Sequence, residues 1–146
     1  MPRYQSVAAV HLFLFRDNKI LLSCRANTGF EDGNYSVPAG HLENNETATQ
    51  AMEREAREEV GITINPEDLK VIHVMHRKST QSRIDFFFTS EKWQGEPVIG
   101  EPDKCSDLSW FALNDLPENM VPYVRFAIEN HHNKVFYSEF GWPKKL

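Results

Sequence analysis

GHLENNETATQAMEREAREEVGI, residues 40–62, is the stretch that decides the fold, because it predicts one well-delimited helix that is rich in glutamate. Apolar residues recur at helical spacing through residues 47–60, which is typical of a helix that buries one face. Thr47 can cap the start of this helix, and Gly61 suits the left-handed conformation that ends it. We therefore predict a helix over residues 47–60.

Glutamates lie on the helix face that should be apolar. At about 100° per residue, one sector of the helix holds Ala48, Ala51, Met52, Ala56 and Val60. Glu55 and Glu59 project into the middle of this sector, and Glu58 flanks it. Neighbouring carboxylates on a partly buried face repel each other and lose hydration. A divalent cation would offset both effects, and carboxylate oxygens suit Mg²⁺, with Mn²⁺ as an alternative.

The hexapeptide REAREE, residues 54–59, is by itself more typical of a solvated helix face, so the flanking residues decide the interpretation. They match the Nudix box, G-x5-E-x7-R-E-U-x-E-E-x-G-U, in which U is a bulky apolar residue. Ala56 stands at the first U position, where a larger residue is usual, and Ala39 precedes the box where many members have a second glycine. The chain resembles the Nudix family through Gly40, Glu46, Arg54, Glu55, Glu58, Glu59, Gly61 and Ile62.

The resemblance implies a hydrolase that breaks a phosphoanhydride bond in a nucleoside diphosphate linked to another group. It also implies that Glu55, Glu58 and Glu59 bind Mg²⁺ or Mn²⁺ together with the main-chain carbonyl of Ala39. One of these glutamates, or a more distant carboxylate, would act as the general base. Glu55 and Glu58 are therefore expected among the catalytic residues.

Other box residues would support this site. By the same resemblance, Arg54 holds a catalytic carboxylate in position and counts as a catalytic residue. Glu46 would brace the junction between the loop and the helix. Gly40 and Gly61 would permit tight backbone at the two ends of the box.

Many family members supply a further carboxylate from a loop that precedes the last strand. Glu101, in IGEPDK, is the candidate here, as a metal ligand or as the general base. A solvated loop glutamate is the alternative interpretation, and Glu96 and Asp103 compete for the same role.

Three residues outside the box are candidates for substrate binding. Arg25 and Arg77 could contact phosphate, because the guanidinium group forks onto phosphate oxygens. Asn119, in LPENMVP, resembles the asparagine with which MutT proteins recognise a purine base, although asparagine also simply favours loops. Histidines on predicted strands are expected to belong to the sheet or its core, namely His11, His73 and His76.

The order of the predicted elements indicates a mixed β-sheet packed by helices. The first two predicted strands read as a hairpin, and so do the two strands after the first helix. No linker divides the sequence, so we expect a single domain over residues 1–146. The resemblance implies fold class α/β (α+β), as the Nudix α/β/α sandwich. The predicted elements are strands at 7–15, 20–24 and 35–40, a helix at 47–60, strands at 69–78, 82–90 and 108–113, and a helix at 121–134.

Composition narrows the class of protein. The 146 residues are 40% apolar and 25% charged, which is typical of a globular domain. A net charge of −5 disfavours a DNA- or RNA-binding surface and a membrane partner. The apolar run at 7–15 is too short to span a bilayer, and no secretory signal is visible. We therefore expect a cytoplasmic protein with a small-molecule nucleotide as partner, and the resemblance allows a homodimer.

Signals that mark Nudix members acting on ADP-ribose, dinucleoside polyphosphates or NADH are missing from the chain. What remains is a resemblance to the MutT-like group, which acts on nucleoside triphosphates or modified nucleotides. One alternative is a Nudix hydrolase acting on ADP-ribose, a nucleotide sugar or another dinucleotide. The other is a Nudix module that senses nucleotides without cleaving them, although such modules usually lose box glutamates and all of them are present here.

Overall fold

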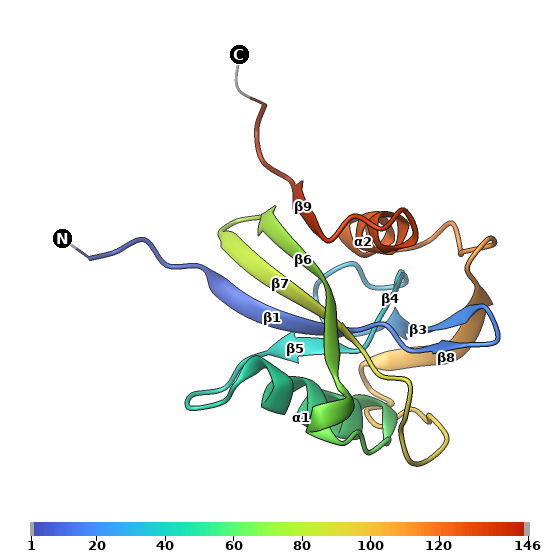
Figure 1. Cartoon of the computed structure of the whole chain (residues 1–146). Coiled ribbons are helices and arrows are strands. Elements are labelled where there is room, and N and C mark those ends of the chain that lie inside the picture. Colours follow the sequence, from blue (N-terminus) through green and yellow to red (C-terminus); the bar gives the residue numbers. More distant parts are fainter. Residues whose placement is uncertain (1, 145–146) are drawn as a thin grey trace.

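The computed structural model describes residues 2–144, which place a β-sheet between two helices (Figure 1). Residues 1 and 145–146 of the expected domain lie outside this range. The helices are α1 (Ala48–Val60) and α2 (Pro122–His132), with a short 3₁₀ helix at Pro66–Asp68. The strands are β1 (Val7–Leu12), β2 (Phe15–Arg16), β3 (Lys19–Arg25), β4 (Tyr35–Ser36), β5 (Ala39–His41), β6 (Lys70–Lys78), β7 (Ser82–Thr89), β8 (Cys105–Ala112) and β9 (Tyr137–Phe140).

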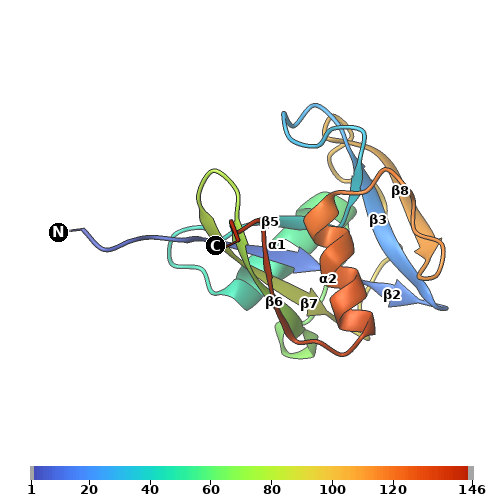
Figure 2. The ribbon, with the colours of Figure 1, turned by 90° about the horizontal axis from the view of Figure 1, so that it is seen from above.

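The central sheet is mixed, as predicted. Its strand order is β5-β1-β7-β6-β9, in which β1 runs parallel to β7 and β6 runs parallel to β9, while the other neighbours are antiparallel. A second sheet is antiparallel and joins β2, β3 and β4, with β8 paired to β3. Figure 2 shows β3 and β8 of this second sheet to the right of the central strands. The α/β/α arrangement expected from the sequence is therefore confirmed.

Each face of the central sheet carries its own apolar core. One core joins Val10 and Leu12 of β1 to the buried face of α1, which consists of Ala51, Met52, Ala56 and Val60. The other core joins Phe13, Met75 and Phe87 to α2 through Val124, Ala127 and Ile128. Because successive residues of a strand point to opposite faces, an apolar run without alternation serves both cores.

The predicted helix over residues 47–60 is confirmed, together with its caps. The Thr47 side chain accepts the backbone N–H of Gln50, and the Gln50 side chain accepts the backbone N–H of Thr47. This reciprocal capping box fixes the first turn. Gly61 ends the helix in the left-handed region with φ 68°. The box residue Ala56 is fully buried.

The predicted hairpin between residues 7–15 and 20–24 is confirmed only next to its turn, where Phe15 pairs with Ile20, and is wrong for residues 7–12. β1 pairs with β5 and β7 of the central sheet, whereas β3 pairs with β2, β4 and β8 of the second sheet. The chain therefore passes from one sheet to the other between β1 and β2. Local pattern does not reveal this crossing, because the parallel partner of β1 lies much later in the chain.

The real hairpin in this region is the short β2–β3 pair. Its turn residues Asp17 and Asn18 have φ values of 54° and 61°. Positive φ at both central residues is the geometry that matches the twist of a two-residue hairpin, and Asp and Asn tolerate it. The second predicted hairpin, formed by β6 and β7, is confirmed.

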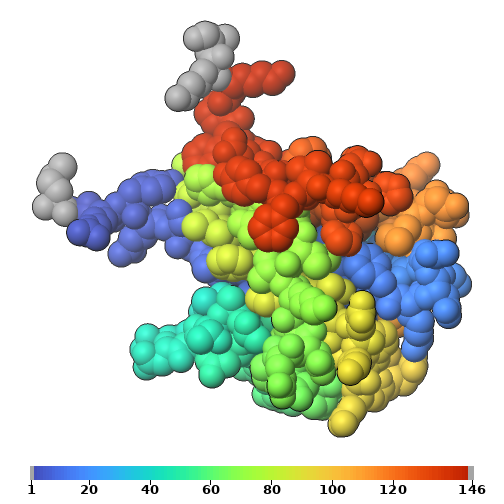
Figure 3. Space-filling view, in the orientation of Figure 1, coloured from blue at the N-terminus to red at the C-terminus, as the bar shows by residue number. Residues whose placement is uncertain are grey.

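The C-terminal segment adds a strand that the sequence pattern does not predict. β9 pairs in parallel with β6 at the edge of the central sheet, with Val74 opposite Tyr137. In the space-filling view, this segment and α2 form the upper layer in orange and red (Figure 3). β9 therefore adds a fifth strand to the edge of the central sheet, beside a strand to which no hairpin connects it.

A loop over residues 91–104 reaches the end of α1 and then leads into β8. The backbone N–H of Gly100 donates to the carbonyl of Glu59 at 2.8 Å. A β-carbon at Gly100 would lie 2.2 Å from the carbonyl oxygen of Glu58, so only glycine permits this approach. The contact places Glu101, the next residue, beside the last turn of α1.

Candidate active site

A cleft of about 1040 Å³ opens beside α1 and β5, and it is also lined by the segment after β3 and by the β6–β7 turn. Ligand clefts typically hold about 300–1,000 Å³, so the space suits a nucleotide. Three predicted residues, Glu46, Gly61 and Asn119, do not line the cleft. The predicted site residues that do line it are Arg25, Ala39, Gly40, Arg54, Glu55, Glu58, Glu59, Arg77 and Glu101.

The glutamate face of α1 lies directly against β5. A β-carbon on Gly40 would come within 2.2 Å of Cδ and Oε1 of Glu55, so any side chain at this position would displace that carboxylate. Gly40 is not among the residues with positive φ, whereas Gly61 is. The expectation that Gly40 permits tight backbone is therefore corrected, because its role is to leave room for Glu55.

Glu59 is held against the same strand. The backbone N–H of Ala39 donates to Oε2 of Glu59 at 2.8 Å. Burial, followed by repulsion from Glu55, raises the pKa of Glu59 to about 8 although the Ala39 hydrogen bond opposes this. Burial also raises the pKa of Glu55, against the influence of Arg54. These carboxylates thus lie where negative charge is unfavourable without a cation.

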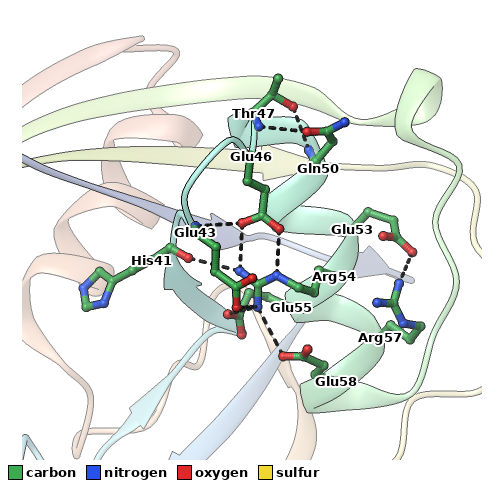
Figure 4. A network of polar contacts seen from close by, with 10 residues as sticks. All are labelled: His41, Glu43, Glu46, Thr47, Gln50, Glu53, Arg54, Glu55, Arg57 and Glu58. Atoms are coloured by element: carbon green, nitrogen blue, oxygen red, sulfur yellow. Dashed lines mark hydrogen bonds and ion pairs between the residues drawn. The ribbon is translucent and has the colours of Figure 1, made fainter.

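Arg54 binds several carboxylates at once (Figure 4). Its Nε and Nη2 donate to the two oxygens of Glu46 at 2.8 and 2.9 Å. Its Nη1 donates to Glu55 at 2.7 Å and to Glu58 at 3.2 Å, and Nη2 also donates to the carbonyl of His41 at 3.1 Å. A guanidinium group has five N–H donors, so none remains for phosphate. The arginine positions carboxylates, and its hydrogen bonds lower the pKa of Glu46 to about 2.

Glu101 lines the cleft, whereas its two competitors do not. Repulsion from Glu101 is, after burial and Glu55, among the causes that raise the pKa of Glu59, as expected of a nearby carboxylate. Glu96 instead forms an ion pair with Arg16 at 2.7 Å on the second sheet. Asp103 is exposed and lies outside the cleft lining.

Arg25 occupies the part of the cleft that the 26–34 loop lines. Its Nε donates to the carbonyl of Phe30 at 2.7 Å, and its Nη2 donates to the hydroxyl of Thr28 at 3.1 Å. Within residues 2–144, no carboxylate forms an ion pair with Arg25. Its positive charge therefore remains available to phosphate.

Arg77 has a different environment. Its side chain is buried, its Nε donates to Asp85 at 2.7 Å, and its guanidinium lies 3.7 Å from the ring centre of Tyr123. Asp85 is also bonded to Nε2 of His11 at 3.0 Å. Nδ1 of His11 is buried without a partner in the described chain, which generally destabilises a protein by about 1–3 kcal/mol. Sequence reasoning assigned His11 to the sheet but missed that it lines the cleft.

Asn119 lies outside the cleft and contacts the loop that borders it. Its side-chain amide donates to the carbonyl of Gly33 at 2.9 Å, and its own carbonyl accepts the backbone N–H of Tyr35 at 2.8 Å. These bonds tie the segment before α2 to the 26–34 loop. In this structure the Asn119 side chain thus braces the loop that borders the cleft.

Comparison with known proteins identifies the family of this chain. A model of the NUDIX domain matches residues 5–130. The chain belongs to the Nudix family. This Nudix chain is 29% identical, over 80% of its length, to the 8-oxo-dGTP diphosphatase of Escherichia coli strain K12, of which it covers 91%. It is also 32% identical, over 75% of its length, to an ADP-ribose pyrophosphatase of Methanocaldococcus jannaschii, of which it spans 64%.

The fold agrees with a solved Nudix structure. A MutT NUDIX hydrolase from Burkholderia pseudomallei superposes with a TM-score of 0.79 at 29% identity, covering 86% of this chain and 97% of that one. The curated relatives are named as a diphosphatase and a pyrophosphatase. Together with the matching domain, they identify the chain as a Nudix hydrolase that acts on phosphoanhydride bonds.

The donor chemistry of the Nudix site fits a hard divalent cation. Glu55, Glu58, Glu59 and the carbonyl of Ala39 offer oxygen ligands only, which Mg²⁺ and Mn²⁺ prefer. In the described part of the chain, these groups are not gathered into a ready coordination shell. Glu55 and Glu58 instead accept hydrogen bonds from Arg54, and Glu59 accepts one from the backbone N–H of Ala39.

Proposed function

We propose that this Nudix hydrolase depends on Mg²⁺, or alternatively Mn²⁺, and cleaves a nucleoside triphosphate or modified nucleotide between phosphates. The observation that carries the proposal is the row of Glu55, Glu58 and Glu59 on α1, in which Glu55 and Glu59 lie against β5 and burial and repulsion raise the pKa values of these two carboxylates. When bound there, the cation neutralises phosphate charge and lowers the pKa of a water molecule.

The residues of the chain divide the remaining work. A water oxygen attacks one phosphorus, the phosphoanhydride bond breaks, and the leaving phosphate departs with the electron pair. A carboxylate accepts the proton of the water, and we assign this step to Glu101 or to Glu58, the most exposed of the three box carboxylates that face the cleft. Arg54 positions Glu55 and Glu58. Arg25 binds phosphate oxygens through its unpaired charge.

The choice of substrate follows the relatives. The 8-oxo-dGTP diphosphatase, by its name, acts on a modified nucleoside triphosphate, and this Nudix chain covers most of it. The ADP-ribose pyrophosphatase keeps the second alternative open, since its identity to this chain is similar. For Asn119 we propose a role in bracing the 26–34 loop, on the ground of its bond to Gly33.

We further propose that residues 1–146 act as one cytoplasmic domain that takes a small-molecule nucleotide and no DNA, RNA or membrane partner, with a homodimer compatible. The acidic net charge of −5 supports the exclusion of nucleic acid. Neither helix in residues 2–144 is long and apolar enough to cross a bilayer.

The decisive experiment is hydrolysis of a nucleotide panel with Mg²⁺, with Mn²⁺ and with EDTA. The panel contains canonical and oxidised triphosphates, ADP-ribose, dinucleoside polyphosphates and nucleotide sugars. Glu58→Gln is the test variant, and Glu53→Gln is its matched control, because Glu53 lies on the same helix, pairs with Arg57 and does not line the cleft.

Metal-dependent release of pyrophosphate from triphosphates, lost in Glu58→Gln and kept in Glu53→Gln, would support the proposal. The relative rates would then show which nucleobase the enzyme prefers. Full activity in Glu58→Gln would refute the metal site. Binding of nucleotides without any hydrolysis would instead favour a sensing module.

A further inference from the structure

A cluster of buried polar residues lies in the wall of the cleft and takes no part in the proposed metal chemistry. His11 on β1, Asp85 on β7 and Arg77 on β6 are only 2%, 0% and 6% exposed. Asp85 accepts hydrogen bonds from both neighbours, at 3.0 Å from His11 Nε2 and at 2.7 Å from Arg77 Nε. His11 and Arg77 line the cleft, so the cluster borders the space that a ligand would fill.

Asp85 supplies the negative charge that faces Arg77 in this cluster. Burial opposes the ionisation of Asp85, but hydrogen bonds and charge attraction, first from His11 and then from Arg77, outweigh it and lower the pKa of Asp85 to about 2. The carboxylate therefore neutralises the guanidinium beside it and would repel a phosphate. Arg25, in contrast, forms no ion pair with a carboxylate within residues 2–144: it donates hydrogen bonds to a main-chain carbonyl and a hydroxyl and lies over the ring of Phe30. Phosphate thus suits the Arg25 side of the cleft, and an uncharged group suits the cluster.

Two atoms of the cluster have no hydrogen-bond partner within residues 2–144: Nδ1 of His11, an acceptor, and Nη1 of Arg77, a donor. Ionised Asp85 can only accept, so Nε2 of His11 carries the proton of that hydrogen bond. In the neutral imidazole, Nδ1 is then a bare acceptor, and it has no partner in the described chain. Arg77 uses Nε and Nη2 toward Asp85, while Nη1 makes no hydrogen bond within residues 2–144.

Planar side chains pack against both His11 and Arg77. The guanidinium of Arg77 lies 3.7 Å from the ring centre of Tyr123, which also lines the cleft. The ring of His11 stacks on Phe87 with centres 4.5 Å apart, and Tyr123 meets it edge-on at 5.7 Å. Packed rings and a planar guanidinium leave little rotational freedom, so the wall is preorganised for a planar ligand.

We propose that His11, Arg77 and Tyr123 form the subsite for a neutral, planar nitrogen heterocycle, namely the nucleobase of the substrate, whose N–H donates to Nδ1 of His11. Asp85 is the positioning residue that fixes the His11 tautomer and the Arg77 fork. The assignment rests on the proposed function in taking a nucleotide as the ligand, and it moves Arg77 from phosphate to the base.

The test variant is His11→Gln. A glutamine amide can still donate to Asp85, but it does not reproduce the Nδ1 acceptor. The matched control is His76→Gln, because His76 does not line the cleft: its Nε2 lies 3.1 Å from the hydroxyl of Ser82, and its ring packs against Trp142. Thermal unfolding and circular dichroism establish that each variant is folded.

Binding is measured by calorimetry in EDTA, so that no hydrolysis is required. The probes are GMP and AMP, their analogues N1,N2,N2-trimethyl-GMP and N6,N6-dimethyl-AMP, which lack base N–H donors, and inorganic pyrophosphate, which reports phosphate contacts alone. The wild type should bind the preferred nucleotide about tenfold tighter than its methylated analogue, the value of one hydrogen bond. His11→Gln should lose this discrimination and leave pyrophosphate binding unchanged, while His76→Gln behaves as wild type.

Two results would overturn the assignment. Unchanged discrimination in His11→Gln would mean that Nδ1 holds a trapped water only. Equal weakening of nucleotide and pyrophosphate would mean that the whole cleft is distorted. If His11→Gln does not fold, Arg77→Lys, which keeps the charge toward Asp85 but loses the planar fork, tests the other side of the subsite: it should weaken nucleotide binding and leave pyrophosphate binding unchanged.

The outcome is separable from the proposed function. If the wild type hydrolyses nothing with metal, the proposed function fails, yet base discrimination in EDTA can still be measured. If hydrolysis is metal-dependent but His11→Gln discriminates as wild type does, only the base subsite fails.

Discussion

Gly40 and Glu55 are in such close contact that a β-carbon on the glycine would lie 2.2 Å from the carboxyl carbon of the glutamate. Gly40→Ala should therefore push Glu55 out of the site without straining the backbone, since φ at Gly40 is not positive. A misplacement of about 1 Å at an active site can reduce the rate about 100-fold. We expect a loss of this order in kcat with little change in the unfolding temperature. Activity within about twofold of wild type would show that Glu55 simply moves aside.

Arg54 uses its full set of donors on carboxylates and one carbonyl, so its planar fork should matter more than its charge. Arg54→Lys keeps the charge but cannot make five bonds. Loss of such support around a metal site typically weakens metal affinity about 10–100-fold, and we expect this range for Mg²⁺ in activity titrations. Arg57→Lys is the control, because the ion pair that Arg57 forms within residues 2–144 is with Glu53, on the side of α1 that does not line the cleft. Equal effects of both changes would argue against a positioning role.

Glu101 and Glu96 offer a matched pair for the general base. Glu101 lines the cleft, whereas Glu96 is bound to Arg16 outside it. If Glu101 accepts the proton of water, Glu101→Gln should lower kcat about 10²–10⁴-fold, and Glu96→Gln should leave it unchanged. Steady-state kinetics at saturating Mg²⁺ provides the measurement. A kcat near wild type in Glu101→Gln would assign the step to Glu58.

Removal of the metal should be visible in stability through Glu59. Burial and repulsion from Glu55 disfavour its charge, so a bound cation should stabilise the folded protein. At a concentration 100 times the dissociation constant, one bound ligand adds about 2.7 kcal/mol. Wild type should therefore unfold at a higher temperature in Mg²⁺ than in EDTA. Glu59→Gln should be at least as stable as wild type in EDTA and should lose most of the response to Mg²⁺. A full response in this variant would exclude Glu59 as a ligand.

Acid should weaken the Asp85 cluster. Because the folded protein lowers the pKa of Asp85 from 3.8 to about 2, its stabilising contribution is complete above 3.8 and is lost as the pH falls toward 2. Asp85→Asn leaves Arg77 buried without its counter-charge, which typically destabilises a protein by about 3–5 kcal/mol at neutral pH. The difference in the free energy of unfolding between wild type and Asp85→Asn should shrink between pH 4 and 2. A difference independent of pH in urea titrations would mean that Asp85 does not titrate as described.

Local sequence was sufficient for the helix and for its glutamate-bearing face. Thr47, Gly61 and the helical spacing of the glutamates act within a few residues of each other, so period and capping rules apply directly. The resemblance carried by the same segment also led to Arg54 and Glu46, which contact each other across eight residues. The role of Gly40 was misread, because the atom that it must avoid belongs to a residue on another element.

Contacts between distant segments decided the rest. Three features depend on strands that are distant in the sequence, which local patterns do not predict. They are the pairing of β1 with β7, the crossing of the chain between the two sheets, and the addition of β9. The bond between His11 and Asp85 joins residues 74 positions apart, so neither residue signalled the other in the sequence. The sequence by itself determined which side chains a metal would need, since helical spacing fixes them locally. Only the tertiary structure decided which side chains face the rest of the ligand, because strand pairing across the whole chain sets the walls of the cleft.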